Sequence, residues 1–370
     1  METLRGGILM LFRWLVHYPV VHLTYRVRGW TRAPYLLEPG LENKPGILVS
    51  NYGNYLYDNM IALMTAPVWP YVFVRAPVCR IPLLKYIIRF FRAVPIVRAN
   101  DTAFSNEKRI EENEKTFARV AELLRKGHWL SAFPEQQPGH RARIAKPFKP
   151  GVAHVALRAE DAAGWGLGLR IYAYGTNYEN KFAGRSNIYV RWASPIEVAR
   201  YRDTFTRNPI EAEQILTAEI ERSLHETVLE AATTEQLGDA YRLAFQQGRP
   251  NFSGIQNALN EVVSGKATPE QLHKIVCRKG RESALYQIVG YALLGFGAVV
   301  GWPFRMFGRL CASDRSQEMT YQFVLWALVL GTGVLISDWY WAGVMAIGTW
   351  GSMSTWLWAW RRGIVEDLSV

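Results

Sequence analysis

The sequence predicts an α/β domain joined to membrane-embedded segments. Two observations support this fold class: short β-prone runs alternate with helix-like stretches in the first half of the chain, and the C-terminal third contains long apolar runs. The chain has 370 residues, 49% of them hydrophobic, which is enough for one sizeable core and excludes a disordered or low-complexity protein.

Six runs rich in β-branched and aromatic residues are predicted strands, at residues 46–49, 71–74, 94–97, 129–133, 169–174 and 188–192. Helix-like stretches lie between them, at residues 59–65, 82–91, 106–126 and 149–158. This alternation predicts a sheet flanked by helices over residues 33–205. Residues 206–283 are polar and helical, with a break at 250–254, and predict a helical appendage.

The C-terminal region, residues 284–370, is predicted to lie in a membrane. Residues 284–303 contain Gln287 as the only strongly polar side chain, and a run of this length can cross a hydrocarbon core of ~30 Å. Two further apolar runs follow, separated by Asp338, and the basic residues lie at the other ends of these runs. We expect a bent or re-entrant segment plus a helical hairpin, with the α/β domain on the cytoplasmic face.

The N-terminal segment, residues 1–32, has a different character. Its apolar run at 7–21 contains Arg13 and His17 and leads into a basic stretch at 25–32. Both features predict a membrane-interfacial helix, and an ordinary amphipathic helix packed on the domain fits the same pattern.

The net charge indicates the class of partner, and the cysteine spacing bears on disulfides and metal sites. The net charge of +11 predicts an anionic partner, and the basic residues flank apolar segments, which favours anionic lipid headgroups over nucleic acid. Cys79, Cys277 and Cys311 lack the spacing of a disulfide framework, and no metal-ligand spacing occurs among the other residues. We therefore expect no metal.

Polar residues gather where the predicted strands end. The first cluster, after the strand at 46–49, contains Asn51, Tyr52, Asn54 and Asp58. The later clusters contain Arg98, then Glu135, His140, Arg141 and Lys149, and finally the run YGTNY at 174–178. Because α/β folds place their sites at strand ends, these residues predict one anion-binding cleft in which arginines grip a phosphate.

The order of these motifs resembles the glycerol-3-phosphate and lysophosphatidate acyltransferases of phospholipid synthesis, in particular a branch with C-terminal hydrophobic segments. The motifs are SNYGNYLYD at 50–58, PIVR at 95–98, FPE at 133–135, KPGVAHVAL at 149–157, GTNY at 175–178 and SPI at 194–196. The resemblance implies a glycerolipid-acyltransferase-like sheet. It also implies acyl transfer from acyl-CoA or acyl carrier protein to a hydroxyl of glycerol-3-phosphate or lysophosphatidate, without any other cofactor.

The resemblance assigns roles to individual residues. In such enzymes a histidine takes the proton of the acceptor hydroxyl and an aspartate, here Asp58, orients that histidine. Asn51 and Asn54 match polar companions of this pair, Arg98 and Glu135 match residues that hold the acceptor, and Arg141 and Lys149 match weaker positions.

Three departures from the family pattern affect the chemistry. Tyr52 occupies the position of the catalytic histidine. The pKa of a tyrosine is ~10 against ~6.5 for histidine, so its basic form is scarcer at neutral pH by about a thousandfold. Bulky residues at 136–138 replace a glycine-rich turn, and Arg92 stands where a glycine often precedes the second-motif strand.

Two functions follow. The first is a catalytically degenerate protein, a pseudoenzyme that acts as a lipid-binding or structural subunit of a membrane complex, with membrane lipids and other membrane proteins as partners. The second is an active acyltransferase that uses Tyr52, His140 or the substrate phosphate as its base. Structural alternatives also stand for single residues: Asp58 as a helix cap, Glu135 as an acceptor for a loop backbone, and His140 as a solvated loop residue.

Overall fold

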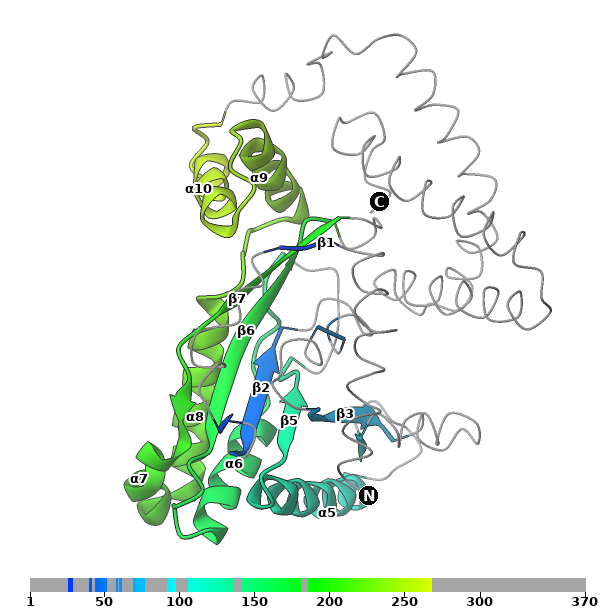
Figure 1. Ribbon diagram of the computed structural model, residues 1–370, viewed down its shortest axis with the longest axis vertical. Helices are drawn as coiled ribbons and strands as arrows, with labels where there is room; N and C mark the ends of the chain where they lie inside the picture. The colour runs from blue at the N-terminus through cyan, green and yellow to red at the C-terminus, as the bar shows by residue number, and fades with distance from the viewer. Residues whose placement is uncertain are drawn as a thin grey trace, which may run out of the picture.

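Eight strands form one mixed sheet in the described part of the chain. The computed structural model describes residues 26–28, 40–41, 44–51, 58, 60–61, 69–76, 92–97, 106–135, 142–180 and 186–267. The strands are β1 (Arg26–Arg28), β2 (Gly46–Ser50), β3 (Tyr71–Arg75), β4 (Ala93–Ile96), β5 (Trp129–Ala132), β6 (Arg170–Tyr178), β7 (Asn187–Trp192) and β8 (Ile196–Glu197). Their order is β1-β7-β6-β2-β5-β3-β4, and β8 pairs with β6 (Figure 1).

The directions of the strands bring the sequence motifs to one edge of the sheet. Strand β2 pairs in parallel with both β5 and β6, and β3 pairs in parallel with β5 and β4. The carboxyl ends of these five strands therefore share an edge, which is where α/β folds place their sites. Strands β7 and β8 are antiparallel to β6, and β1 is parallel to β7.

The six predicted strands correspond to β2 through β7, and two short strands were not predicted. Strand β1 lies in the basic stretch at 25–32 that follows the predicted N-terminal helix, and its three residues pair with Asn187, Ile188 and Tyr189 of β7. A run of three residues with Val27 as its one apolar member gives no periodic signal, so this edge strand depends on the strand beside it. The two-residue strand β8 is likewise too short to give a periodic pattern in the sequence.

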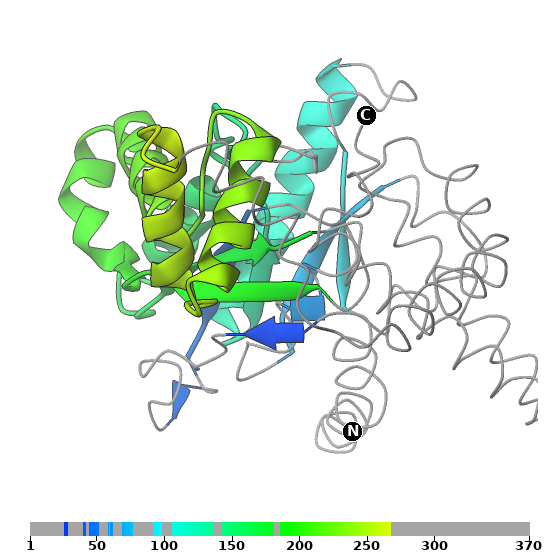
Figure 2. The same cartoon turned by 90° about the horizontal axis from the view of Figure 1, so that it is seen from above.

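Helices cover one face of the sheet in the described residues. They are α5 (Asn106–Arg125), α6 (Gly151–Ala162), α7 (Arg202–Arg207) and α8 (Pro209–His225), with a short 3-10 turn η5 (Val198–Tyr201) before α7 (Figure 2). Leu216 and Ile220 of α8 pack in the same core as Ile47 and Ala173 of the sheet. Helix α8, which lies within the predicted appendage at residues 206–283, thus shares the core of the α/β unit.

Aromatic side chains line the other face of the sheet. Trp129 of β5 stacks on Tyr172 of β6 with ring centroids 5.2 Å apart, and Tyr174 lies 4.7 Å from Trp192 of β7. Side chains alternate between faces along a strand, so Ile171 and Ala173 face the helices while Tyr172 and Tyr174 face the aromatic layer.

Helices α9 (Thr234–Gln246) and α10 (Phe252–Val263) form a second, smaller core at the far end of the sheet from α5 (Figure 1). The break between them overlaps the predicted break at 250–254, although α10 already begins at Phe252. Asn251 caps α10 by accepting a hydrogen bond from the Gly254 N–H at 2.8 Å. The predicted membrane segments at 284–370 and the N-terminal helix lie outside the described residues. None of the helices that the structure describes has both the length and the apolar character needed to span a bilayer.

Gly175 gives a direct test of how closely the connection after α8 lies on β6. A Cβ atom at this position would lie 2.2 Å from the carbonyl oxygen of Thr227, so we expect Gly175→Ala to lower the free energy of unfolding by about 2 kcal/mol or more. Gly238 in α9 has nothing within 4 Å of the corresponding position, and Gly238→Ala should raise stability by about 0.5–1 kcal/mol. Denaturant titrations of the two variants in detergent measure both changes, and a neutral Gly175→Ala would contradict the packing.

Candidate active site

The side chain of Asn51 continues the pairing between β2 and β6 beyond the end of β2. Its Oδ1 accepts a hydrogen bond from the backbone N–H of Thr176 at 2.8 Å, and its Nδ2 donates to the Thr176 carbonyl at 3.0 Å. A side-chain amide has the same donor and acceptor as a peptide unit, so Asn51 replaces a residue of the ladder. In this way the first motif fixes the carboxyl end of β6.

Asp58 lies on a helical turn with Met60 and Ile61, and its side chain is fully buried. Its Oδ1 accepts a hydrogen bond of 2.6 Å from the Tyr178 hydroxyl, and the Thr176 hydroxyl lies 3.1 Å from the same oxygen. Because a buried carboxyl group without donors is costly, these two hydroxyl groups of β6 stabilise Asp58 in place. The bonds join residues more than a hundred positions apart in the chain.

The Thr176 hydroxyl lies within hydrogen-bond distance of two acceptor oxygens. It lies 3.1 Å from Oδ1 of Asn51 and 3.1 Å from Oδ1 of Asp58, and a hydroxyl has one hydrogen to donate. Asn51 also receives the Thr176 N–H and Asp58 also receives the Tyr178 hydroxyl, so the Thr176 hydroxyl can donate to either oxygen. Thr176 therefore links the first-motif asparagine to the first-motif aspartate.

Tyr174 contributes an apolar boundary to this site. Burial raises the pKa of its phenol well above the ordinary value, and the negative charge of Asp58 raises the pKa further. The phenol stays protonated at neutral pH, so Tyr174 supplies no base beside Asp58.

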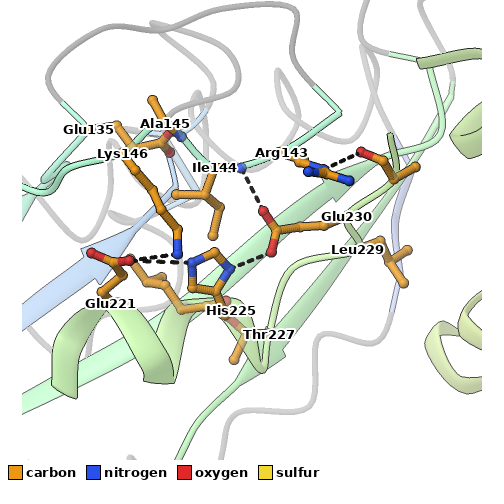
Figure 3. A network of polar contacts seen from close by, with 12 residues as sticks. Glu135, Arg143, Ile144, Ala145, Lys146, Glu221, His225, Thr227, Leu229 and Glu230 are labelled. Atoms are coloured by element: carbon orange, nitrogen blue, oxygen red, sulfur yellow. Dashed lines mark hydrogen bonds and ion pairs between the residues drawn. The ribbon is translucent and has the colours of Figure 1, made fainter. Parts of the chain in front are cut away.

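Glu135 follows β5, and its Oε2 accepts a hydrogen bond of 2.8 Å from the backbone N–H of Ala145 (Figure 3). Glu135 thus accepts a hydrogen bond from a loop backbone, which is the alternative to ligand binding that the sequence left open. Lys149 is exposed and lies just before α6, and its N–H faces the carbonyl of Pro134 at 3.5 Å. Both residues thus lie at the carboxyl edge of the sheet.

The predicted residues Tyr52, Asn54, Arg98, His140 and Arg141 lie outside the described residues, so the roles assigned to them stay predictions. The residue before Arg98 is fixed from α5, where the side-chain amide of Asn113 bonds both the N–H and the carbonyl of Val97, at 3.0 and 2.9 Å. Across the described ranges, no group of three or more His, Cys, Asp or Glu side chains is placed to hold a metal ion.

Sequence reasoning missed Thr176 and Tyr178 as partners of Asp58. The run YGTNY indicates a polar cluster, but the sequence alone gives its members no individual role. The signal was available, because residues 174, 176 and 178 of one strand share a face and the first-motif residues follow the neighbouring strand.

Comparison with known proteins decides the family. A family model described as Acyltransferase matches residues 26–174. This chain contains a domain of the acyltransferase family. The match confirms, for these residues, the acyltransferase family that the motifs suggested.

Two further comparisons concern solved structures and curated proteins. A solved structure with similarity to this chain is the 1-acyl-sn-glycerophosphate acyltransferase PlsC of Thermotoga maritima. The two share 12% identity over 60% of this chain and 88% of that chain, with a TM-score of 0.36. No curated protein matches this chain.

One departure of this acyltransferase domain has a visible structural consequence. Arg92 adopts a φ of +53° directly before β4, at the position where a glycine often stands in the family. A left-handed backbone favours glycine, and here the arginine is held by a 3.1 Å hydrogen bond from Nη1 to the Trp69 carbonyl. The turn into the second motif is therefore retained without its glycine.

The hydroxyl of Thr176 should stabilise this acyltransferase domain through Asp58 and Asn51. We expect Thr176→Val, which keeps the shape but removes the donor, to lower the free energy of unfolding by about 1–3 kcal/mol. The control Thr176→Ser keeps the hydroxyl and loses one methyl group, about 0.8 kcal/mol. Denaturant titration followed by tryptophan fluorescence measures both values, and equal losses would show that the hydroxyl is not the stabilising group.

Proposed function

We propose that this protein binds a glycerolipid in an acyltransferase fold whose catalytic centre has degenerated. The observation that supports the proposal most strongly is the environment of Asp58: its Oδ1 is bonded by Tyr178 and approached by Thr176, while tyrosine replaces histidine at position 52. Two features thus stand against the family reaction: tyrosine stands in place of the base, and the carboxylate that would orient a base already accepts a hydrogen bond from Tyr178.

The missing base is the larger of the two losses. A general base of the right pKa contributes typically ~10² to 10⁴ to the rate of a proton-transfer reaction. Tyrosine in its neutral form has no comparable basicity at neutral pH. The bond from Tyr178 adds a second obstacle, because it competes with a histidine at position 52 for one of the two carboxylate oxygens of Asp58.

The proposed ligand follows from charge and from the family. Arginines and lysines after strands β4 and β5 suit the phosphate of a glycerol-3-phosphate or lysophosphatidate, and the net charge of +11 suits an anionic membrane surface. We place the domain on the cytoplasmic face of the membrane, anchored by residues 284–370, where it acts as a lipid-binding or structural subunit beside other membrane proteins.

One observation favours a second function, an active acyltransferase. The Tyr178 hydroxyl is 2.6 Å from Asp58, close enough for its proton to pass to the carboxylate while its oxygen takes the proton of an acceptor hydroxyl. The acceptor oxygen would attack the thioester carbonyl, and the carbon–sulfur bond would then break. The sulfur would leave as a thiolate, while the proton would remain on Asp58. In this mechanism Tyr178, not Tyr52, transmits the proton.

Acyl transfer by the full-length protein in detergent separates these functions. The assay supplies acyl-CoA or acyl carrier protein with glycerol-3-phosphate or lysophosphatidate. We expect no transfer by the wild type, weak transfer by Tyr52→His, and at least tenfold more by Tyr52→His/Tyr178→Phe, because the second change frees the Asp58 oxygen.

The controls address the two tyrosines separately. Adding Asp58→Asn to the double variant should abolish the restored transfer. Wild-type transfer that Tyr178→Phe abolishes and Tyr52→Phe preserves would contradict the degenerate centre and establish the proton relay through Tyr178.

A further inference from the structure

The connection between α8 and α9 lies beside the segment that follows the third motif. Ala231 donates its N–H to the carbonyl of Ala142 at 2.9 Å, and the carbonyl of Ala231 accepts from Nε of Arg143 at 2.9 Å. Figure 3 shows the two stretches side by side, with Glu230 pointing from the connection toward Ile144. Residues 142–146 are called the motif-three segment below.

Glu230 uses both of its carboxylate oxygens. Its Oε1 accepts a 2.8 Å hydrogen bond from the backbone N–H of Ile144, whose side chain is buried. Its Oε2 contacts Nδ1 of His225, the last residue of α8. The carboxylate therefore ties the motif-three segment to the end of a helix that belongs to the main core.

The side chain of His225 lies between two carboxylates. Its second ring nitrogen, Nε2, is buried and lies 3.8 Å from Oε1 of Glu221. Glu221 in turn forms an ion pair of 2.8 Å with Nζ of Lys146, the last residue of the motif-three segment. Both ring nitrogens of His225 thus lie toward carboxylates, and the contact with Oε2 orients Glu230.

Two consecutive N–H groups of the motif-three segment point to two carboxylates. Ile144 donates to Glu230, and Ala145 donates to Glu135, each at 2.8 Å. Fixing the peptide of Ile144 restricts the backbone angles that aim the next N–H, because the chain has two soft dihedral angles per residue. The position of Glu135 thus depends on a carboxylate that lies outside every sequence motif.

We propose that Glu230, oriented by His225, is a positioning residue for Glu135 and so for the glycerolipid that Glu135 helps to bind. The role of Glu135 in ligand binding rests on the proposed function, whereas the coupling between the two carboxylates does not. Glu230 and His225 lie in none of the motifs that define the site.

Hydrogen–deuterium exchange with residue-level resolution tests the coupling on the full-length protein in detergent, without any ligand. We expect Glu230→Ala to speed exchange at Ala145 about tenfold, although Ala145 is bonded to Glu135 and not to Glu230. Glu230→Gln keeps an oxygen for Ile144 and should restore most of the protection. The matched control is Glu226→Ala, since the carboxylate of this exposed residue makes no hydrogen bond or ion pair within the described part of the chain. Faster exchange at Ile144 alone, with Ala145 unchanged, would overturn the proposal.

A double-mutant cycle on lysophosphatidate binding then tests the consequence. We expect Glu230→Ala to weaken binding about five- to tenfold in the wild-type background and to have no further effect in Glu135→Ala. Equal losses in both backgrounds would overturn a route through Glu135. If the wild type binds no lysophosphatidate, the proposed function fails, and the exchange experiment still decides the coupling.

Discussion

Burying the carboxyl group of Asp58 is the constraint on which the site depends. A carboxyl group that is withdrawn from water needs donors, and in this chain they come from the far end of β6, as the hydroxyls of Tyr178 and Thr176. That solution requires β6 to extend past β2 and to be held there, which Asn51 does by pairing with Thr176. The register of one pair of strands therefore sets the environment of the aspartate.

Strand β6 connects this site to the rest of the molecule through its opposite face. The side chain of Asn177, between Thr176 and Tyr178, donates to the carbonyls of Tyr189 and Thr227 and accepts from the N–H of Leu229. The same connection after α8 that contacts Asn177 also contains Glu230, which holds the motif-three segment. Both carboxylates of the site, Asp58 and Glu135, thus depend on the position of one short connection.

The sequence predicted the strands better than the packing of the helices and the partners of the site. Strands β2 to β7 have β-branched and aromatic runs, whereas β1 has too few residues for any pattern. Helix α8 was assigned to an appendage because it is polar overall, although Leu216, Ile220 and Leu224 form a stripe at intervals of four that indicates a buried face. Asp58 and Glu135 follow from motifs. Tyr178 did not, because its bond to Asp58 depends on pairing between distant strands, and Glu230 lies in no motif at all.

The proposed degenerate site retains a lipid but does not acylate it. Native mass spectrometry of the full-length protein, released from detergent after incubation with lysophosphatidate and acyl-CoA, measures both properties at once. We expect a complex of the protein with intact lysophosphatidate, in which the mass of the lipid stays constant over hours. Conversion of the bound lipid to its diacyl product, or the absence of any retained lipid, would contradict it.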